Sequence, residues 1–306
     1  MIVPSQSGIK IPLKPSPNEK ASICGKTNLS RIKTTINVGG EIIDLSRPKV
    51  MGILNLTPDS FYAGSRKMTM KEILGEAESM LEAGATFLDV GGYSSRPGAT
   101  DITADEELKR VEAPIQAIKK EFPESIVSID TFRSEVARKA VDAGAAIVND
   151  ISAGHLDSKM LETVALLGVP YIAMHMRGTP QDMKELTEYE DILQEVMYYF
   201  SKIIKDCNEL GVKDVVIDVG FGFAKTTDQS FNLLENLEHF EHLNKPVLVG
   251  VSRKSMIYRS LEITPEEALN GTTVLNTVAL LKGASILRVH DVREALQAIE
   301  LIGKLK

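Results

Sequence analysis

The feature that most constrains this fold is a regular alternation between short apolar runs and longer segments with helical periodicity. Each apolar run ends in a polar residue or glycine, as buried parallel strands commonly do. The runs lie at 50–56, 87–91, 126–130, 146–151, 171–176, 215–221, 246–251 and 286–291. The helical segments lie near 69–84, 105–121, 133–143, 158–168, 189–210, 228–240, 265–282 and 291–304. Eight consecutive β-α units predict one α/β domain, a closed parallel (β/α)₈ TIM barrel.

An open, doubly wound sheet is the structural alternative to the barrel. That fold usually carries a Gly-x-Gly-x-x-Gly loop after its first strand, where this chain reads Thr-Pro-Asp-Ser at 57–60. Two short runs around a Gly-Gly pair at 34–47 predict a β-hairpin before the barrel. We therefore expect a flexible tail over residues 1–34 and the barrel over residues 35–306. Several helical segments should end at a glycine in the left-handed conformation, at Gly84, Gly144, Gly168, Gly211 and Gly283.

Composition narrows the class of protein. The net charge of −7 disfavours nucleic acid or an anionic membrane surface as a partner. The basic residues of the N-terminal tail indicate a solvated segment more than a transit peptide, because arginine is scarce there. Cys24 and Cys207 lack the spacing of a redox or zinc motif and fit a reducing compartment. No apolar run is long enough to span a bilayer. These features predict a cytoplasmic enzyme.

Polar residues collect where the predicted strands end, and in a (β/α)₈ barrel this is the edge that carries reactive groups. Because strand side chains alternate, Arg288 and His290 share one face, opposite Leu287 and Val289. The apolar face must cover the helices, so the polar face should point into the barrel mouth. Buried charges without partners are costly, so their convergence indicates a ligand site. The candidate residues are Asn55, Asp130, Asn149, Asp218, Arg288 and His290.

Some of these residues also have a purely structural interpretation. Asp130 can cap the following helix, Asn149 can satisfy a loop backbone, and His290 can be a hydrogen-bonded rim histidine. His175 alternates with two methionines, so we interpret it as a packing residue. Met174 and Met176 then line the mouth, where their soft side chains suit an aromatic ring.

The segment Ser-Arg-Lys-Ser at 252–255 follows the seventh apolar run and directly precedes a helical pattern. Cations at a helix N-terminus oppose the helix dipole, so this arrangement predicts an anion bound by Arg253, Lys254 and the backbone amides. A solvated basic turn is the alternative. Carboxylates, amides and cations in one ring suit a ligand that has a guanidine-like edge and also carries phosphate.

Seven segments, taken together, resemble the dihydropteroate synthase family. They read MGILNLTPDSF (51–61), SRPGA (95–99), SIDTF (128–132), VNDIS (148–152), IDVGFGFAK (217–225), VGVSRKS (249–255) and RVHDV (288–292). They occur in the family's order, and the match covers most of residues 34–304. The resemblance implies a transferase of folate biosynthesis that joins 6-hydroxymethyl-7,8-dihydropterin diphosphate to 4-aminobenzoate and releases diphosphate. It also implies Mg²⁺, a homodimer and a sulfonamide target.

The resemblance further implies roles for individual residues. The residues implied to bind the pterin ring are Asp130, Asn149, Met174, Asp218, Phe223, Lys254 and Arg288. Those implied at the diphosphate are Asn55, Arg253, Arg288 and His290, with Asn55 also at the Mg²⁺. The implied catalytic residues are Asn55, Lys254, Arg288 and His290. Two loops, 57–67 and 92–104, would close over 4-aminobenzoate with Thr57, Pro58, Asp59, Phe61, Ser95, Arg96 and Pro97, together with Ser255.

This chain departs from the family pattern at Ser95, where Thr is common, at Val219, where Pro is common, and in the stretch after Phe61. These departures concern the aminobenzoate pocket and sulfonamide sensitivity more than the pterin site. A pterin-dependent methyltransferase domain is the alternative function, although it has no need of the TPDSF, SRPGA and SRKS segments. An aldolase or isomerase that uses Lys254 as a Schiff base and an inactive binding module are further alternatives. No nucleophile is paired with a base at the rim, which favours direct displacement without a covalent intermediate.

Overall fold

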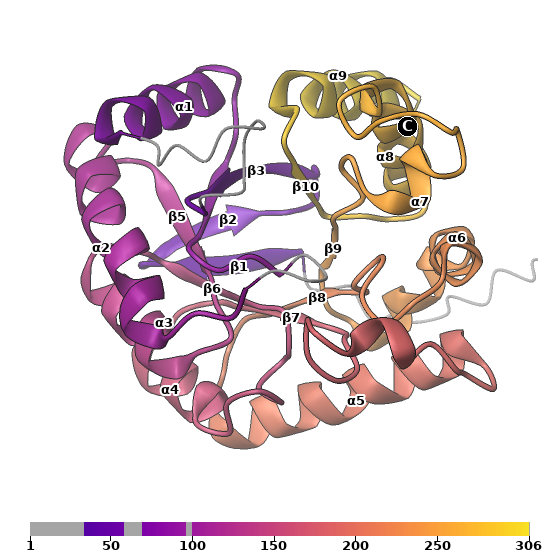
Figure 1. Cartoon of the computed structure of the whole chain (residues 1–306), viewed down its shortest axis with the longest axis horizontal. Helices are drawn as coiled ribbons and strands as arrows, with labels where there is room; N and C mark the ends of the chain where they lie inside the picture. Colours follow the sequence, from indigo (N-terminus) through magenta and orange to yellow (C-terminus); the bar gives the residue numbers. More distant parts are fainter. Residues whose placement is uncertain (1–33, 58–68, 96–99, 306) are drawn as a thin grey trace, which may run out of the picture. The chain divides into compact units, whose positions relative to one another are not determined.

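The computed structural model describes residues 34–57, 69–95 and 100–305, and within them eight parallel strands close into a barrel (Figure 1). Their hydrogen-bonded order is β10-β3-β4-β5-β6-β7-β8-β9. The strands are β3 (Lys49–Asn55), β4 (Phe87–Gly91), β5 (Ile126–Asp130), β6 (Ile147–Asp150), β7 (Tyr171–Met174), β8 (Val215–Asp218), β9 (Val247–Val249) and β10 (Ile286–Val289). The predicted (β/α)₈ barrel is confirmed. The predicted tail at residues 1–34 lies, up to residue 33, outside the described part of the chain.

Helices follow the strands and ring the outside of the barrel (Figure 1). They are α1 (Met70–Glu82), α2 (Ala104–Glu121), α3 (Ser134–Asp142), α4 (Met160–Leu167), α5 (Ile192–Leu210), α6 (Thr227–Glu235), α7 (Ser255–Tyr258), α8 (Leu269–Leu281) and α9 (Val292–Gly303), with 3₁₀ helices η1 (Met183–Glu185) and η2 (Leu237–Leu243). Thr69, Thr103 and Thr226 begin three helices with complete capping boxes. Gly168 and Gly211 close α4 and α5 at positive φ, as predicted.

Two helical segments differ from the sequence-based prediction. The helix expected at 228–240 ends at Glu235, and the chain continues as the 3₁₀ helix η2; the backbone N–H and the side-chain amide of Asn236 both donate to the Asn232 carbonyl at this junction. The helix expected from 265 begins only at Leu269, after hydrogen-bonded turns at 264–268.

Apolar side chains pack in separate layers on the two faces of the barrel wall. Outward-facing residues such as Val127 and Ile129 join the apolar faces of the helices in the largest cluster. The hairpin formed by β1 (Thr35–Val38) and β2 (Glu41–Asp44) is present as predicted. Its apolar side chains pack against inward-facing residues at the amino ends of the strands, including Phe87 and Ile172. The hairpin therefore covers the bottom of the barrel and leaves the other end for function.

The register of the strands places the inward-facing polar residues side by side at the top of the barrel. Asn55 pairs with Gly91, Gly91 with Asp130, and Asp130 with Asn149 across four neighbouring strands. Farther around the barrel, Met174 pairs with Asp218. No helix in the described ranges is both long and apolar enough to cross a membrane.

Candidate active site

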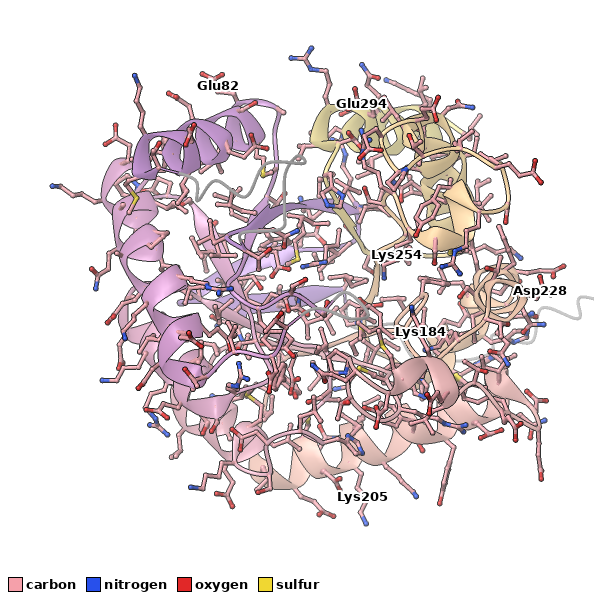
Figure 2. All side chains as sticks on the ribbon, in the orientation of Figure 1. Glu82, Lys184, Lys205, Asp228, Lys254 and Glu294 are labelled. Carbon is pink, nitrogen blue, oxygen red and sulfur yellow. The ribbon has the colours of Figure 1, made fainter. Side chains whose placement is uncertain are left out.

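Asp218, Lys254 and Arg288 converge around Gly250 at the top of the barrel. A methyl group placed on this glycine would lie 3.9 Å from Asp218 Oδ2, 4.0 Å from Lys254 Nζ and 3.9 Å from Arg288 Cβ. Figure 2 shows Lys254 on the barrel side of α7. Because glycine leaves this position free of a side chain, a flat ligand can approach all three groups at once. The predicted convergence of polar residues is therefore present.

Arg288 connects the buried carboxylate of Asp89 with the half-buried carboxylate of Asp130 inside the mouth. Its Nε donates to Asp89 Oδ2 at 2.5 Å, and its Nη2 donates to Asp130 Oδ2 at 2.6 Å. Burial by itself lowers the pKa of Arg288, but the two carboxylates outweigh it and raise that pKa above its ordinary value. The guanidinium therefore stays charged, with the rest of its planar surface available to a ligand.

Asp130 carries a strongly perturbed carboxyl group. Burial raises its pKa to about 7, although Arg288 acts in the opposite direction, and the neighbouring Asp89 adds to the increase. Near neutral pH this group can either accept a hydrogen bond as a carboxylate or donate one as an acid. A group of this kind suits recognition of a heterocycle that presents both donors and acceptors.

Asn149 and Asn55 flank the carboxylates. Asn149 is buried, and its Nδ2 donates to Asp89 Oδ2 at 3.0 Å. A methyl group on Gly91 would lie 3.7 Å from Asn55 Oδ1 and 3.6 Å from Asp130 Oδ2, so both oxygens face the same glycine. This juxtaposition gives a ligand a small cluster of oxygen acceptors on one side of the mouth.

Asp218 and Lys254 form the opposite side of the site. Gly220 N donates to Asp218 Oδ1 at 2.8 Å, while Lys254 Nζ donates to the Phe221 carbonyl at 2.7 Å. Burial raises the pKa of Asp218, and Lys254 partly offsets this. Burial also lowers the pKa of Lys254 to about 8, with Asp218 acting against that shift. The pair thus presents an acceptor and a donor whose charges depend on each other.

Apolar side chains form the wall between these groups. Met174 and Met176 pack in one cluster with the half-buried Phe223 at the top of the barrel. The Phe223 ring centroid lies 4.9 Å from Lys254 Nζ, within range of a cation–π contact. Methionine and phenylalanine surfaces beside polar edges suit a flat aromatic ligand.

Some side chains of the loop at 252–255 make contacts that stabilise the fold, and others face the site. Arg253, predicted to hold an anion, makes a two-point ion pair with Asp291 and donates to the carbonyls of Pro265 and Glu266. Its contact with a ligand anion remains a prediction. Ser252 Oγ lies 3.0 Å from His290 Nδ1 and accepts a bond from His290 N, which fixes the histidine at the rim. Ser255 is the first residue of α7 and is half-buried.

The residues assigned to 4-aminobenzoate are described only in part. Pro58, Asp59, Phe61, Arg96 and Pro97 lie outside the described residues. Thr57 and Ser95 are the last described residues before the two gaps, and both are half-buried.

The donor set at the mouth fits Mg²⁺ only in combination with a substrate. Within 34–57, 69–95 and 100–305, no three His, Cys, Asp or Glu side chains are grouped as a metal site. Mg²⁺ often takes one or two protein oxygens and completes its octahedron with water and substrate phosphate. Asn55 Oδ1 and the nearby Asp130 carboxyl could supply such oxygens.

Sequence reasoning missed Asp89, which is fully buried and contacts both Arg288 and Asn149. The signal was present, because inward-facing Phe87, Asp89 and Gly91 alternate along the second barrel strand. Ser252 was named only as part of the Ser-Arg-Lys-Ser segment, and the contact of its hydroxyl with His290 was not predicted.

Comparison with known proteins agrees with this geometry. The family model described as pterin binding enzyme matches residues 51–290. A dihydropteroate synthase of Escherichia coli is 42% identical over 265 residues, covering 86% of this chain and 93% of that protein. A Yersinia pestis dihydropteroate synthase, solved in a sulfonamide complex, has a TM-score of 0.84 at 37% identity and covers 89% of this chain and 98% of that one. The Xanthomonas albilineans dihydropteroate synthase with 4-aminobenzoic acid has a TM-score of 0.82 at 36% identity, with the same coverage. The chain therefore belongs to the pterin-binding enzymes and, within them, to the dihydropteroate synthase family.

Proposed function

We propose that this chain condenses 6-hydroxymethyl-7,8-dihydropterin diphosphate with 4-aminobenzoate, giving 7,8-dihydropteroate and diphosphate. The observation that carries the proposal is the convergence of Asp218, Lys254 and Arg288 around Gly250, beside the Asp89–Asp130–Asn149 cluster. A methyltransferase domain would share the pterin contacts. The family membership and the relative solved with 4-aminobenzoic acid favour the synthase.

The pterin ring would lie between the two polar sides of the mouth. Asp218 would accept from the 2-amino and N3 groups, since its Oδ2 faces the glycine-lined centre. Lys254 would donate to the ring carbonyl, and Asp130 and Asn149 would pair with the other ring nitrogens. Arg288 would cover one ring face, with Met174 and Phe223 along the wall.

The diphosphate would point towards the rim, where Asn55, Arg253, Arg288 and His290 are its proposed partners. Bound Mg²⁺ would add positive charge that stabilises the leaving diphosphate. Arg288 is suited to a dual role, because the carboxylates of Asp89 and Asp130 hold its guanidinium at the junction between the ring and the rim.

The reaction would proceed by displacement at the methylene carbon. The amine lone pair of 4-aminobenzoate forms the new C–N bond, the C–O bond to diphosphate breaks with its electron pair, and the amine loses one proton. The arylamine is already neutral, so attack needs no prior deprotonation. Charge builds up on the leaving group, and Arg288 and His290 would stabilise it there. Thr57, Ser95 and Ser255, with the flanking segments, would hold 4-aminobenzoate in line with the carbon.

We further propose that the enzyme works in the cytoplasm as a homodimer. The exposed apolar side chains of Val274, Leu281 and Leu301 on α8 and α9 support an interface on that face. Sedimentation of the wild-type chain and of a Val274→Lys, Leu281→Lys variant tests it, and a monomeric wild-type protein would contradict the dimer.

The decisive experiment is a reconstituted reaction. Purified protein with Mg²⁺, 4-aminobenzoate and the dihydropterin diphosphate should release dihydropteroate and diphosphate in equal amounts. EDTA should abolish turnover, excess Mg²⁺ should restore it, and Asn55→Ala should need more Mg²⁺ than wild type. A protein that binds the pterin tightly but makes no dihydropteroate would refute the synthase. Borohydride trapping of a covalent adduct on Lys254 would overturn the direct displacement.

A further inference from the structure

A buried lysine, Lys225, lies under the pterin site and has no role in the mechanism above. Its Nζ lies 2.8 Å from His175 Nδ1 and donates to the carbonyls of Gly220 at 3.0 Å and Phe223 at 2.9 Å. The side chain is 7% exposed, and its bonds go to neutral groups. An ammonium in such a place is costly, and burial lowers the pKa of Lys225 well below its ordinary value. The cost of burying this amine indicates that its hydrogen bonds have a specific role.

The segment that Lys225 binds has an unusual backbone. Between β8 and α6, three alternate residues are left-handed, with φ of 69° at Gly220, 79° at Gly222 and 47° at Ala224. A methyl group on Gly220 would overlap the carbonyl oxygen of His175, so the loop packs directly on the neighbouring strand end. Glycine adopts this conformation without steric cost, but Ala224 is strained there, and such strain persists only where surrounding contacts fix it. Lys225 supplies such contacts from the inside by joining Gly220, Phe223 and His175.

This segment, residues 219–225, is also what holds the pterin-site groups in place. Gly220 N donates to Asp218 Oδ1, and the Phe221 carbonyl accepts from Lys254 Nζ. The Phe223 ring packs beneath the same ammonium group. The loop therefore orients both charged groups of the Asp218–Lys254 side, while Lys225 itself lies behind it.

We propose that Lys225 is a positioning residue for pterin recognition, which locks the 219–225 loop so that Asp218, Lys254 and Phe223 face the ring. His175 is its anchor: neutral and buried against Tyr199, it presents Nδ1 as an acceptor. The proposal rests on the function proposed above. It differs from an ordinary folding role because it predicts a selective loss at one part of the substrate.

Lys225→Met tests the idea by keeping the length and volume of the side chain and removing the ammonium. The matched control is Lys205→Met on the exposed face of α5 (Figure 2), where Lys205 forms an exposed ion pair with Glu209. We expect Lys225→Met to weaken binding of the dihydropterin ring by about tenfold or more, as the loss of one or two well-placed hydrogen bonds would do. The dissociation constant for inorganic diphosphate with Mg²⁺ should stay within about twofold of the wild-type value, because the proposed diphosphate partners lie outside the 219–225 loop.

Two further readouts separate positioning from folding. The pH above which pterin binding weakens should shift in Lys225→Met but not in Lys205→Met. The reason is that the loosened loop no longer holds the Phe221 carbonyl against Lys254 Nζ. In Lys225→Ala, added propylammonium should restore pterin binding, and propanol should not. Equal losses for ring and diphosphate, or wild-type ring affinity in Lys225→Met, would overturn the proposal. Failure of the proposed function is distinct from this, since wild-type protein would then make no dihydropteroate, whereas the Lys225 test compares ring binding between variants.

Discussion

Replacing Asp218 by Asn is the sharpest test of the pterin site, because it removes a charge and leaves the shape. Asp218 is 5% exposed, and one of its oxygens already accepts from Gly220 N at 2.8 Å. The other oxygen faces the glycine-lined centre of the mouth. An amide must keep its oxygen on one of these two sides and turn its NH₂ group to the other, where it meets a donor.

The expected magnitude follows from the bonds that are lost. Two charge-assisted hydrogen bonds to a guanidine-like ring edge contribute about 1.5–3 kcal/mol each, and Asn can replace at most part of one. We expect a loss of about 3 kcal/mol, or roughly 100-fold in the dissociation constant for the dihydropterin ring. Inorganic diphosphate with Mg²⁺ should bind unchanged or slightly more tightly, since a nearby negative charge has been removed.

Titration calorimetry at neutral pH, with the dihydropterin and diphosphate as separate ligands, measures both numbers. Asp228→Asn is the matched control, because it makes the same chemical change on the exposed first turn of α6 (Figure 2). Equal losses for the two ligands, or an unchanged affinity for the ring, would refute the assignment of Asp218 to the ring edge.

Three further predictions use the same electrostatics. The pKa of Asp130 is about 7 and that of Lys254 is about 8, so kcat/KM should rise with pH as Asp130 becomes a carboxylate and fall as Lys254 loses its positive charge. Lys254→Arg should move the falling limb of this profile to higher pH. Arg288→Met should destabilise the fold by about 3–5 kcal/mol in urea unfolding at pH 8, because it leaves buried carboxylates unpaired. The penalty should shrink at pH 5: without Arg288, which lowers the pKa of Asp130, that pKa lies above its wild-type value of about 7, so the variant loses stability as pH rises from the unfolded pKa of about 4 through the folded one. A pH-independent penalty would contradict this. Tyr171→Phe should cost about 1–3 kcal/mol by removing a buried hydroxyl that donates to a carboxylate at 2.7 Å, whereas Tyr198→Phe, at an exposed position, should leave the unfolding midpoint unchanged.

The candidate site shows where local patterns suffice and where they do not. Strand alternation is a local property, so it correctly put Arg288 on the inward face from a few residues of sequence. The same rule would have found Asp89. Its importance was not visible, because its partner Arg288 is 199 residues away and the two meet only through closure of the barrel.

Arg253 illustrates the opposite case. A basic residue after a strand and before a helix predicts an anion contact. That contact stays a prediction, and in the fold the Arg253 guanidinium bonds to Asp291 and to carbonyls of the 264–268 turns, with its own backbone at a φ of 53°. These protein partners lie 12 to 38 residues along the chain, so the sequence next to Arg253 does not specify them.

The sequence by itself determined the repeated β-α order, the hairpin, the helix ends marked by glycine and the edge of the barrel that carries polar groups. All of these follow from periodicity and backbone preference within a few residues. Only the tertiary structure decided which charges pair, how burial shifts the pKa values of Asp130 and Lys254, and that Lys225 lies beneath the 219–225 loop. Those properties depend on distances between strands far apart in the chain and on exclusion of water, and both arise only when the barrel closes.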